Sequence, residues 1–487
     1  MAYDKKFTVE FVIPEYVQAV ARILIKEGFK CYLVGGALRD IVMGIQPDDY
    51  DLATDADPDE MLKIFPKAIS TGAKFGTIIV VIGEKDGSHH DVQVTTFRSE
   101  EQYVDGRWPS KVEFVDDLDV DLSRRDFTFN SMAFDFSSAE LDGKEDNKTW
   151  TVYDPFDGRK DIKNKIVRAV GNPIERFTED GLRAFKACRM AAQLGFEIDP
   201  DTFNAIKETI SVAKQISMER IRDEFVKIIK NSDKPSIGIN LMKESGLLEI
   251  FLPELLEGVG VEQKKFHADD VYDHLLHSLD KAPVEIRLAA LFHDIAKPRK
   301  DMGDGRFYGH DQEGENMTRE IMRRMKFSNA EIENVAKLVR FHMFYFPTVG
   351  DEASREDVEE YEVKKWTDSA VRRFIAKVGE ENLDDLFKLR IADAVSNPKT
   401  MFTPKEIELL QQRISEVRAK DMALKITDLA LNGNDLEKIG VEKGPQMGEI
   451  LKKLLDMVIE DPSINEKEKM ENLVKGWLHP SSSDYAS

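Results

Sequence analysis

Two aspartates separated by one residue are the first groups in the chain that could do chemistry. Asp49 and Asp51 stand in the segment QPDDYDLAT. In a β-strand, residues i and i+2 point to the same side, so the two carboxylates converge and repel each other unless a cation lies between them. Oxygen ligands of this kind suit Mg²⁺, which also bridges substrate phosphates. The pair therefore predicts a magnesium site for phosphoryl transfer, with a solvated turn as the alternative.

A pair of glycines precedes these carboxylates. Gly35 and Gly36 follow the apolar run CYLV, and a predicted helix opens at Ala37. Glycines let the backbone come close to a ligand, and the free N–H groups at a helix start suit phosphates. The order of glycine pair, helix and Asp-x-Asp strand favours a nucleotide site over a plain turn.

Histidines and aspartates in the second half of the chain form another group with metal-ligand character. Four of them follow the order His…His-Asp…Asp: His274, His293, Asp294 and Asp393. Imidazole and carboxylate ligands together suit octahedral Mg, Mn or Ni better than tetrahedral zinc. His310 and His342 are candidates for a second metal or a phosphate, whereas His267 and His277 are predicted to be surface or core residues.

The apolar pattern predicts which elements hold these groups. The runs CYLVG, TIIVVIG and DVQVTTF are typical of strands, and ALRDIVMG and ADPDEMLKIF of helices, so the first 140 residues form an α/β head. After about residue 154, apolar residues recur at spacings of three and four and predict helices throughout. The segment RFTEDGLRAFKACRMAAQLGF is among these helices, while residues 137–149 are a polar loop.

Composition sets the class of protein. The chain has 487 residues, which suggests three or more domains. No run of eighteen uncharged apolar residues occurs, so no membrane partner is expected. The net charge is −22, yet residues 158–189 hold nine Lys or Arg against four Asp or Glu. Such a basic strip suits a polyanion on one face only, or is a solvated helix surface. The two cysteines, Cys31 and Cys188, are predicted to be buried thiols in a cytoplasmic protein.

Motifs in a fixed order carry a family resemblance. GGALRD followed by DYD resembles the opening motif of the polymerase-β-type nucleotidyltransferases, in the class II tRNA nucleotidyltransferase and poly(A) polymerase branch. TTFRSE with YVDGRWP, RRDFTFNSMAFD, YDPFDGRKDI, ERFTEDGLR and SMERIRDEF resemble that branch's later motifs in order, over about residues 30–230. The histidine region resembles the HD phosphohydrolase domain, and the segment from KITDLAL onward resembles the family's tRNA-binding tail.

The resemblance implies four domains. Residues 1–155 are expected to form a nucleotidyltransferase head with a polymerase-β-type sheet, and residues 156–260 a helical neck. Residues 261–400 are expected to form the HD domain, and residues 401–487 an all-α tail. In that tail the resemblance makes Gly433 to Asp435, and Gly444 with Pro445, turn residues that present backbone to RNA, with packing turns between helices as an equal alternative.

The resemblance also implies roles for individual residues. Asp49 and Asp51 are the catalytic metal ligands. The nucleotide contacts are Gly35, Gly36, Arg39, Arg125, Asp180, Arg183, Lys186 and Arg189, with Asp126 and Asn130 near the sugar. Gln93 stands where many relatives have an acid, so Asp91, two residues earlier, is a candidate third carboxylate. Lys186 stands where relatives often have arginine; it keeps the charge and loses the two-nitrogen fork.

The spacing of EDGLR suggests how a base could be chosen. Asp180 and Arg183 are three residues apart, which predicts one helix face. An ionised Asp only accepts hydrogen bonds and Arg only donates them. Cytosine and adenine both present an amino donor beside a ring-nitrogen acceptor, and guanine and uracil present the reverse. The pair is therefore expected to accept C and A without a template; a surface ion pair is the alternative.

Together these features predict an enzyme that adds and repairs the terminal CCA of tRNA with CTP and ATP. The alternatives are a poly(A) polymerase, a split CC- or A-adding enzyme, and a phosphohydrolase with an RNA-binding head. The expected partners are tRNA, CTP and ATP, with no protein partner. The HD domain is expected to hydrolyse phosphates at RNA 3′ ends, or to be a degenerate fold kept for packing.

Overall fold

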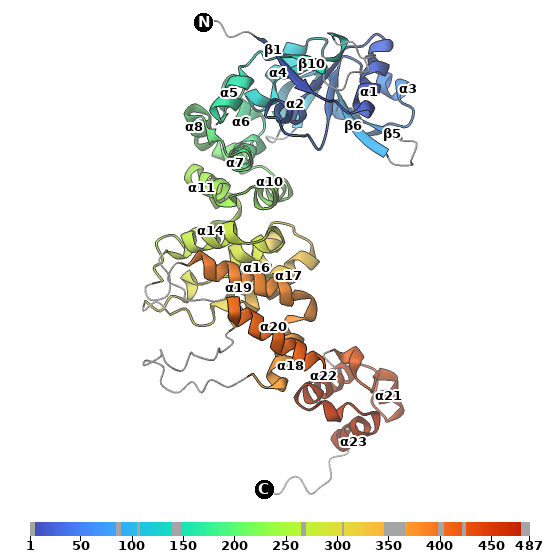
Figure 1. The fold of residues 1–487 in the computed structure, drawn as a ribbon, viewed down its shortest axis with the longest axis vertical. Helices are drawn as coiled ribbons and strands as arrows, with labels where there is room; N and C mark the ends of the chain where they lie inside the picture. The colour runs from blue at the N-terminus through green and yellow to red at the C-terminus, as the bar shows by residue number, and fades with distance from the viewer. Residues whose placement is uncertain are drawn as a thin grey trace. The chain divides into compact units, whose positions relative to one another are not determined.

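The protein was analysed as a computed structural model that describes residues 5–83, 89–104, 108–138, 148–263, 269–303, 306–344, 366–397, 404–420 and 425–478. The chain divides into two compact units, Met1–Leu256 and Glu257–Ser487 (Figure 1). His267 and the centre of YVDGRWP lie outside the described residues. The finer division into four domains stays a prediction.

The head is built on a mixed sheet of the first unit. Its strands, in the spatial order β1-β10-β9-β2-β3-β6-β5-β4, are β1 (Lys6–Phe11), β10 (Lys148–Tyr153), β9 (Ala133–Asp135), β2 (Cys31–Val34), β3 (Asp51–Thr54), β6 (His89–Thr96), β5 (Thr77–Gly83) and β4 (Ile69–Gly72). β3 and β6 are parallel, and the other neighbours are antiparallel. The predicted strands CYLVG, TIIVVIG and DVQVTTF are confirmed as β2, β5 and β6.

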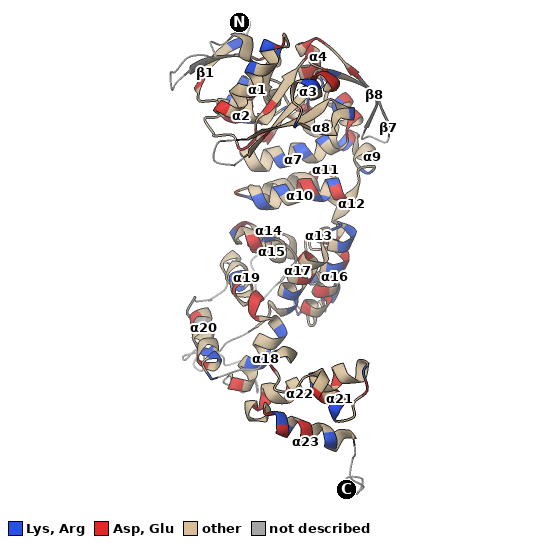
Figure 2. Ribbon diagram, turned by 90° about the vertical axis from the view of Figure 1, so that its right-hand side faces the viewer, with Lys and Arg blue, Asp and Glu red and all other residues tan. Residues whose placement is uncertain are grey.

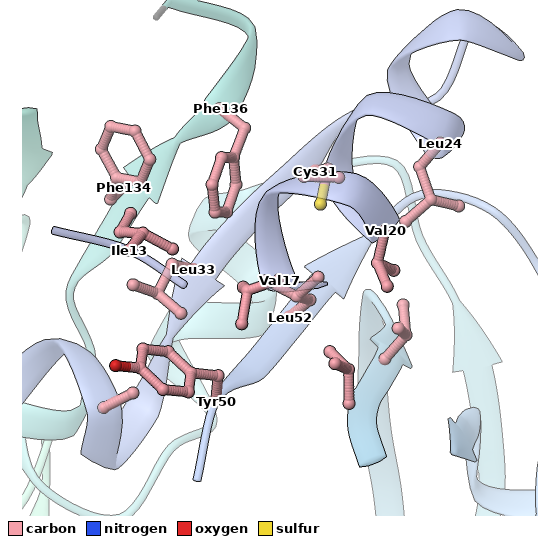
Figure 3. Packing of buried hydrophobic residues seen from close by; sticks show 14 of the residues in the cluster. Ile13, Val17, Val20, Leu24, Cys31, Leu33, Tyr50, Leu52, Phe134 and Phe136 are labelled. Atoms are coloured by element: carbon pink, nitrogen blue, oxygen red, sulfur yellow. The ribbon is translucent and has the colours of Figure 1, made fainter. Parts of the chain in front are cut away.

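Helices and a hairpin complete the head. The predicted helices are confirmed as α2 (Gly35–Val42) and α3 (Pro58–Ile64), although α2 begins two residues earlier than expected. A separate pair of strands, β7 (Arg98–Val104) and β8 (Trp108–Phe114), precedes α4 (Leu118–Ser123). α1 (Glu15–Lys26) buries Val17, Val20 and Leu24 in the same core as the strand residues Leu33 and Leu52 (Figure 3).

Alternation along β3 directs the predicted catalytic residues. Tyr50 is 3% exposed and belongs to the apolar core of the head. Asp51, the next residue, therefore points to the opposite side, because successive residues of a strand alternate. β3 begins at Asp51, so Asp49 lies just before the strand rather than inside it.

Helices follow the head within the first unit. They are α5 (Gly158–Asn164), α6 (Pro173–Glu179), α7 (Leu182–Leu194), α8 (Pro200–Glu208), α9 (Ile210–Ala213), α10 (Met218–Asn231), α11 (Pro235–Ser245), α12 (Leu248–Phe251) and α13 (Pro253–Leu256). The prediction of one helix through RFTEDGLRAFKACRMAAQLGF was wrong. The chain breaks between α6 and α7, where Asp180 is extended and accepts a hydrogen bond from the backbone N–H of Leu182 at 3.0 Å. Gly181 is needed there, since a Cβ would lie 2.9 Å from the Cα of Ala213.

Another close approach ties the head to the helices that follow it. A Cβ on Gly158 would lie 2.4 Å from the carbonyl oxygen of Thr128. We expect Gly158→Ala to lower the free energy of unfolding by about 3 kcal/mol, because backbone must shift to admit the methyl group. Denaturant unfolding of the full chain measures this. Gly83→Ala, where nothing lies within 4 Å of the added Cβ, should change stability by less than about 0.5 kcal/mol. Equal losses in the two variants would contradict the packing argument.

The second unit is helical over its described ranges. Its main helices are α14 (Val271–Lys281), α15 (Arg287–Phe292), α16 (His310–Arg324), α17 (Asn329–Phe341), α18 (Asp368–Val378), α19 (Leu383–Ser396), α20 (Pro404–Arg418), α21 (Gly433–Lys438), α22 (Pro445–Glu460) and α23 (Lys467–Leu478). None of the helices in the described ranges has the length and apolar character needed to cross a bilayer.

The end of the second unit has an apolar core of its own, formed by residues between Leu429 and Val474. The expected turn at Gly433 to Asp435 is the first turn of α21, which the Asn432 side chain caps. Asp435 is buried and pairs with Lys467 at 2.7 Å. The expectation of a turn was therefore wrong, and the contacts of Asp435 are those of packing between helices.

Candidate active site and metal centre

A pocket of about 560 Å³ lies in the first unit, between the sheet and the helices that follow it. It brings together the two glycines that begin α2, the start of β3, the segment that follows α4, and residues of α7 and α10. The predicted site residues that line it are Gly35, Gly36, Asp51, Arg125, Asp126, Asn130, Asp180, Arg183 and Lys186. Residues as far apart in the sequence as Val34 and Arg220 are thus gathered around one cavity.

The two catalytic candidates stand at one end of this pocket. Asp51 lines it, and Asp49 is exposed beside it. Burial raises the pKa of Asp51, and the charge of Asp49 raises it further, while Arg125 acts in the opposite direction. Two carboxylates that repel each other in this way are suited to binding a divalent cation.

The register of the sheet bears on the third carboxylate. β3 and β6 are paired so that Gln93 stands opposite Asp51, and Gln93 lines the pocket. Asp91 is exposed on the same face of β6, two residues away, which is about 7 Å along a strand. The position beside Asp51 is therefore held by an amide, and a ligand role for Asp91 stays a prediction.

The glycine pair leaves room that side chains would fill. Gly35 has φ of +74°, and a Cβ there would lie 3.4 Å from both Arg125 Nη1 and Asp51 Oδ2. A Cβ on Gly36 would lie 3.5 Å from Arg39 Nη2. Arg39 itself pairs with Asp40 at 2.7 Å and is not among the residues that line the pocket. A direct contact of Arg39 with nucleotide stays a prediction.

Asp180 and Arg183 both reach the pocket, but not from one helix face. Asp180 lies at the break before α7, and its carboxylate pairs with Arg220 of α10 at 3.2 Å. Arg183 pairs with Glu179 at 2.7 Å and donates to the carbonyl of Arg124 at 2.8 Å. The expected acceptor and donor therefore face the same cavity from two sides of a chain break, each held by a separate partner.

The two other basic residues of α7, Lys186 and Arg189, have different surroundings. Lys186 lines the pocket and lies 3.7 Å from the carboxylate of Asp126. Arg189 does not line it; its guanidinium pairs with the buried Glu224 of α10 at 2.5 Å. The expectation that Arg189 contacts nucleotide is not supported by this geometry, since the ion pair joins the two helices. Basic positions on α7 and α10 are blue in Figure 2.

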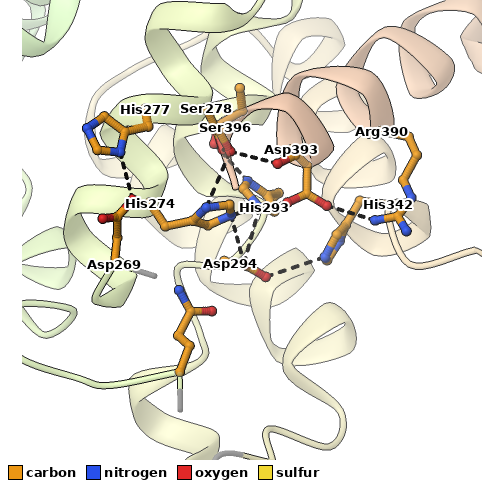
Figure 4. Close-up of polar contacts among 12 residues, drawn as sticks. Asp269, His274, His277, Ser278, His293, Asp294, His342, Arg390, Asp393 and Ser396 are labelled. Carbon is orange, nitrogen blue, oxygen red and sulfur yellow. Dashed lines mark hydrogen bonds and ion pairs between the residues drawn. The ribbon is translucent and has the colours of Figure 1, made fainter. Parts of the chain in front are cut away.

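Buried residues of the second unit form two adjoining clusters of metal-ligand type (Figure 4). The first is His274, His293 and Asp393, and the second is Asp294, His310 and His342. His274 lies on α14 and Asp393 on α19, and the His293-Asp294 pair follows directly after α15. All four residues of the predicted His…His-Asp…Asp set are therefore together, with two further histidines beside them.

Asp294 stands between the two clusters. Its Oδ2 lies 3.2 Å from Nε2 of His293 and 3.6 Å from Nε2 of His274. Its Oδ1 lies 3.3 Å from Nε2 of His310 and 3.5 Å from Nε2 of His342. Oδ1 is buried and has no hydrogen-bond partner, which is costly for a carboxylate oxygen. The arrangement of this oxygen and the surrounding imidazoles suits a cation.

The imidazoles are oriented to offer lone pairs. Three of them bond from Nδ1 to a main-chain carbonyl: His293 to Ala290 at 2.8 Å, His310 to Phe307 at 2.7 Å and His342 to Val339 at 2.6 Å. A carbonyl only accepts, so Nδ1 carries a hydrogen in each of these rings, and Nε2 is the nitrogen that faces the cluster and offers a lone pair when the ring is neutral. Metal-binding histidines are commonly fixed in this way.

Charge in the cluster is uneven. Burial lowers the pKa of His293, but the carboxylates of Asp294 and Asp393 outweigh it and raise the pKa to about 10. Burial, with the charge of His293 adding to it, lowers the pKa of His342 and keeps that ring neutral. Lys297 lies 2.5 Å from Asp294 Oδ2 and supplies a positive charge beside the first cluster.

Comparison with known proteins identifies the domains of this chain. Residues 31–168 match the poly A polymerase head domain, residues 195–258 the probable RNA and SrmB-binding site of polymerase A, and residues 267–397 the HD domain. The CCA-adding enzyme of Lactococcus lactis subsp. lactis strain IL1403 is 31% identical over 467 residues, which cover 95% of this chain and 98% of that protein. The CCA-adding enzyme of Ligilactobacillus salivarius strain UCC118 is 33% identical over 94% and 95% of the two chains. The chain belongs to the CCA-adding enzyme family.

A solved structure agrees over the whole chain. The Bacillus stearothermophilus CCA-adding enzyme in complex with CTP superposes with a TM-score of 0.65 at 25% identity, covering 96% of this chain and 98% of that one. The nucleotidyltransferase head and the helical regions predicted from the sequence are therefore those of CCA-adding enzymes, which are tRNA nucleotidyltransferases.

Three arginines that line the pocket, Arg98, Arg124 and Arg220, were not predicted as site residues from the sequence. Arg124 is the first residue of the RRDFT motif, and Arg220 lies in SMERIRDEF, so both stood in motifs that were recognised. Arg220 contacts Asp180 across 40 positions of sequence, and its Nη1 is buried without a hydrogen-bond partner. No local spacing could have revealed that contact.

Proposed function

We propose that this chain adds and repairs the terminal CCA of tRNA from CTP and ATP without a template, releasing pyrophosphate. The observation that carries the proposal is the single pocket that holds Asp51, the glycine turn and the Asp180 and Arg183 pair. The two buried free cysteines suit a reducing cytoplasm as its location.

Asp49 and Asp51 hold magnesium ions in this proposal. Bound Mg²⁺ supplies charge that activates the terminal 3′-hydroxyl of the tRNA and neutralises the leaving pyrophosphate. Gly35 and Gly36 let the backbone approach the phosphates, and Arg125 and Lys186 provide positive charge for the triphosphate.

Base choice follows from the direction of hydrogen bonding. Asp180 accepts from the exocyclic amino group of cytosine or adenine, and Arg183 donates to the neighbouring ring nitrogen. Both side chains must leave their present partners, Arg220 and Glu179, or share them with the base. Guanine and uracil would place a carbonyl against the carboxylate and an N–H against the guanidinium.

We expect Asp180→Ala and Arg183→Ala to reduce the efficiency of CTP and ATP use by about ten- to a hundredfold, since each removes one side of the pairing. Arg183→Ala should also permit UTP use. Steady-state incorporation of all four nucleotides, with the exposed Asp201→Ala of α8 as the control, measures both effects. An unchanged preference for C over U in both variants would defeat this account of base choice.

A product ladder separates CCA addition from its relatives. Purified protein is offered tRNAs that lack the last one, two or three nucleotides, with each nucleotide alone and with CTP and ATP together. We expect completion of all three primers and no extension beyond the final A. Stopping after CC, adding A only, or adding a run of A would identify a CC-adding, A-adding or poly(A)-adding enzyme.

For the second unit we propose a metal-dependent phosphohydrolase that acts on 3′-phosphates or 2′,3′-cyclic phosphates of RNA. His274, His293, Asp294 and Asp393 would hold one divalent ion, Mg, Mn or Ni, and Asp294, His310 and His342 would hold a second. The unpartnered Oδ1 of Asp294 and the inward Nε2 atoms support this ligand set. A metal bound there supplies the Lewis-acid charge that activates water and polarises the phosphate.

The chemistry of the transferase gives such a hydrolase a purpose. Transfer needs a free 3′-hydroxyl as nucleophile, and a phosphate or cyclic phosphate at that position blocks it. A hydrolase on the same chain clears damaged ends at high effective concentration. The full chain should therefore hydrolyse a 2′,3′-cyclic phosphate end when supplied with Mg, Mn or Ni. No hydrolysis of monoester or diester substrates with any of the three metals would leave the domain a packing element.

A further inference from the structure

One buried carboxylate lies behind the wall of the nucleotide pocket. Asp121, in α4, is 1% exposed and is not among the residues that line the cavity. A carboxylate is costly to bury unless it is paired and hydrogen-bonded. The contacts of Asp121 therefore indicate its role.

Those contacts go to arginines of the pocket wall. Oδ1 of Asp121 accepts from Nε and Nη2 of Arg124 at 3.0 and 2.5 Å. Oδ2 accepts from Nε and Nη2 of Arg125 at 3.3 and 3.0 Å. The backbone N–H of Arg98 donates to Oδ1 at 3.4 Å. Each oxygen thus holds one guanidinium by two of its nitrogens, and all three arginines line the pocket.

The pair with Asp121 uses Nε and Nη2 of Arg125, and the third nitrogen, Nη1, lies on the side of the metal-binding carboxylate of Asp51. A Cβ on Gly35 would lie 3.4 Å from Nη1 of Arg125 and 3.4 Å from Oδ2 of Asp51. Arg125 therefore has one edge fixed by Asp121 and the other beside the metal-binding carboxylate. The phosphates of a nucleotide would lie there if a metal ion on Asp51 bound them.

The charge balance leaves the pocket positive. Burial would raise the pKa of Asp121, but the charges and hydrogen bonds of Arg125 and Arg124 outweigh it and hold the pKa below its usual value. One negative charge is thus set against two guanidinium groups. Arginines fixed before the ligand arrives also lose little conformational freedom when it binds.

We propose that Asp121 is a positioning residue for nucleotide transfer, which holds Arg124 and Arg125 in place for the triphosphate of CTP and ATP. The inference rests on the proposed role of Arg125 in binding the triphosphate. It adds a residue that acts only through other side chains and touches no reacting atom.

The test compares two ligands that differ only in their phosphates. CTP affinity and CMP affinity are measured as competitive inhibition constants against ATP incorporation into a primer that needs only A. Asp121→Asn should weaken CTP by at least about tenfold, the cost of a charged hydrogen-bonded contact. It should leave CMP within about twofold, because the base and the first phosphate do not need the displaced arginines. An equal loss for both ligands would show a general collapse of the pocket and overturn the proposal.

A control variant and a second substitution of Asp121 distinguish a positioning role from a general loss of stability. Asp161 is also buried, at 3%, and bonds to Thr128 at 2.7 Å and Arg168 at 3.2 Å, away from the pocket. Asp161→Asn should lower stability without changing the ratio of CTP to CMP affinity. Asp121→Glu keeps the charge and moves the carboxylate by one methylene, so it should also weaken CTP selectively. CTP affinity unchanged in the folded Asp121→Glu and Asp121→Asn proteins would overturn the proposal.

Arg125→Ala distinguishes this inference from the function on which it rests. If Arg125→Ala keeps native CTP affinity, the role of Arg125 in triphosphate binding is wrong. If Arg125→Ala loses affinity and Asp121→Asn does not, the positioning role alone is wrong. When the two changes are combined, the loss should be smaller than the product of the single losses, because both act on the same guanidinium. Independent effects would contradict the link between Asp121 and Arg125.

Discussion

Replacing Asp51 with alanine should reduce the incorporation of both CTP and ATP by on the order of a thousandfold or more, since the metal ions lose a ligand that every transfer step uses. Asp49→Ala should do the same, because the charge of Asp49 acts on Asp51 and the two carboxylates are proposed to bind the same ions. Binding of tRNA should stay within about twofold of native, because neither residue is needed for the fold of the helices that follow.

Single-turnover incorporation into primers that need only C, or only A, measures the effect. Asp59→Ala, an exposed carboxylate in the first turn of α3, is the matched control and should keep native rates. Normal A addition with only C addition lost would show that Asp49 and Asp51 are not the shared centre of transfer.

Replacing Asp294 with alanine should abolish hydrolysis of a cyclic phosphate end, by on the order of a thousandfold, and remove bound metal from the second unit. Among the described residues of the two clusters, Asp294 has one oxygen facing each cluster, so neither cluster keeps a complete ligand set without it. CCA addition to an intact tRNA should be unchanged, because the transfer pocket is formed by residues of the first unit.

Metal content measured on the dialysed full chain accompanies the activity. His310→Ala or His342→Ala should leave one divalent ion where the native chain holds two, and His277→Ala, an exposed residue paired with Asp269, should leave both. A native chain that binds one ion, and keeps it in the His310 and His342 variants, would contradict the shared role of Asp294.

Members of the transfer centre and of the histidine cluster could be predicted from the sequence, but not all of their contacts. Asp51 and the Gly35-Gly36 turn are close in sequence and joined by one helix, so spacing and alternation placed them together. The adjacent His293 and Asp294 were likewise recognisable as a unit. That Asp294 serves two clusters was not, because the contact with His342 depends on how α15 and α17 pack.

Errors arose where tertiary contacts overrode local spacing. The three-residue interval between Asp180 and Arg183 predicted a shared helix face, but the backbone of Gly181 packs against Ala213 and the helix breaks. Arg189 continues the interval of Arg183 and Lys186 but does not line the pocket, so its contact with nucleotide stays a prediction. The buried Glu224 of α10 draws it away, and nothing in the sequence around Arg189 signals that partner.

The ligand set around Asp294 has a consequence for what the second site releases. Asp294 and Asp393 are the only carboxylates in the two clusters found among the described residues, and Lys297 adds a positive charge at 2.5 Å from the shared one. Two divalent ions would bring more positive charge than these two carboxylates cancel, so the loaded centre would carry an excess of positive charge. A terminal phosphate monoester carries more negative charge than the cyclic diester from which it forms, and would be held more tightly. Turnover at this centre should then be limited by departure of the product, and inorganic phosphate should inhibit it.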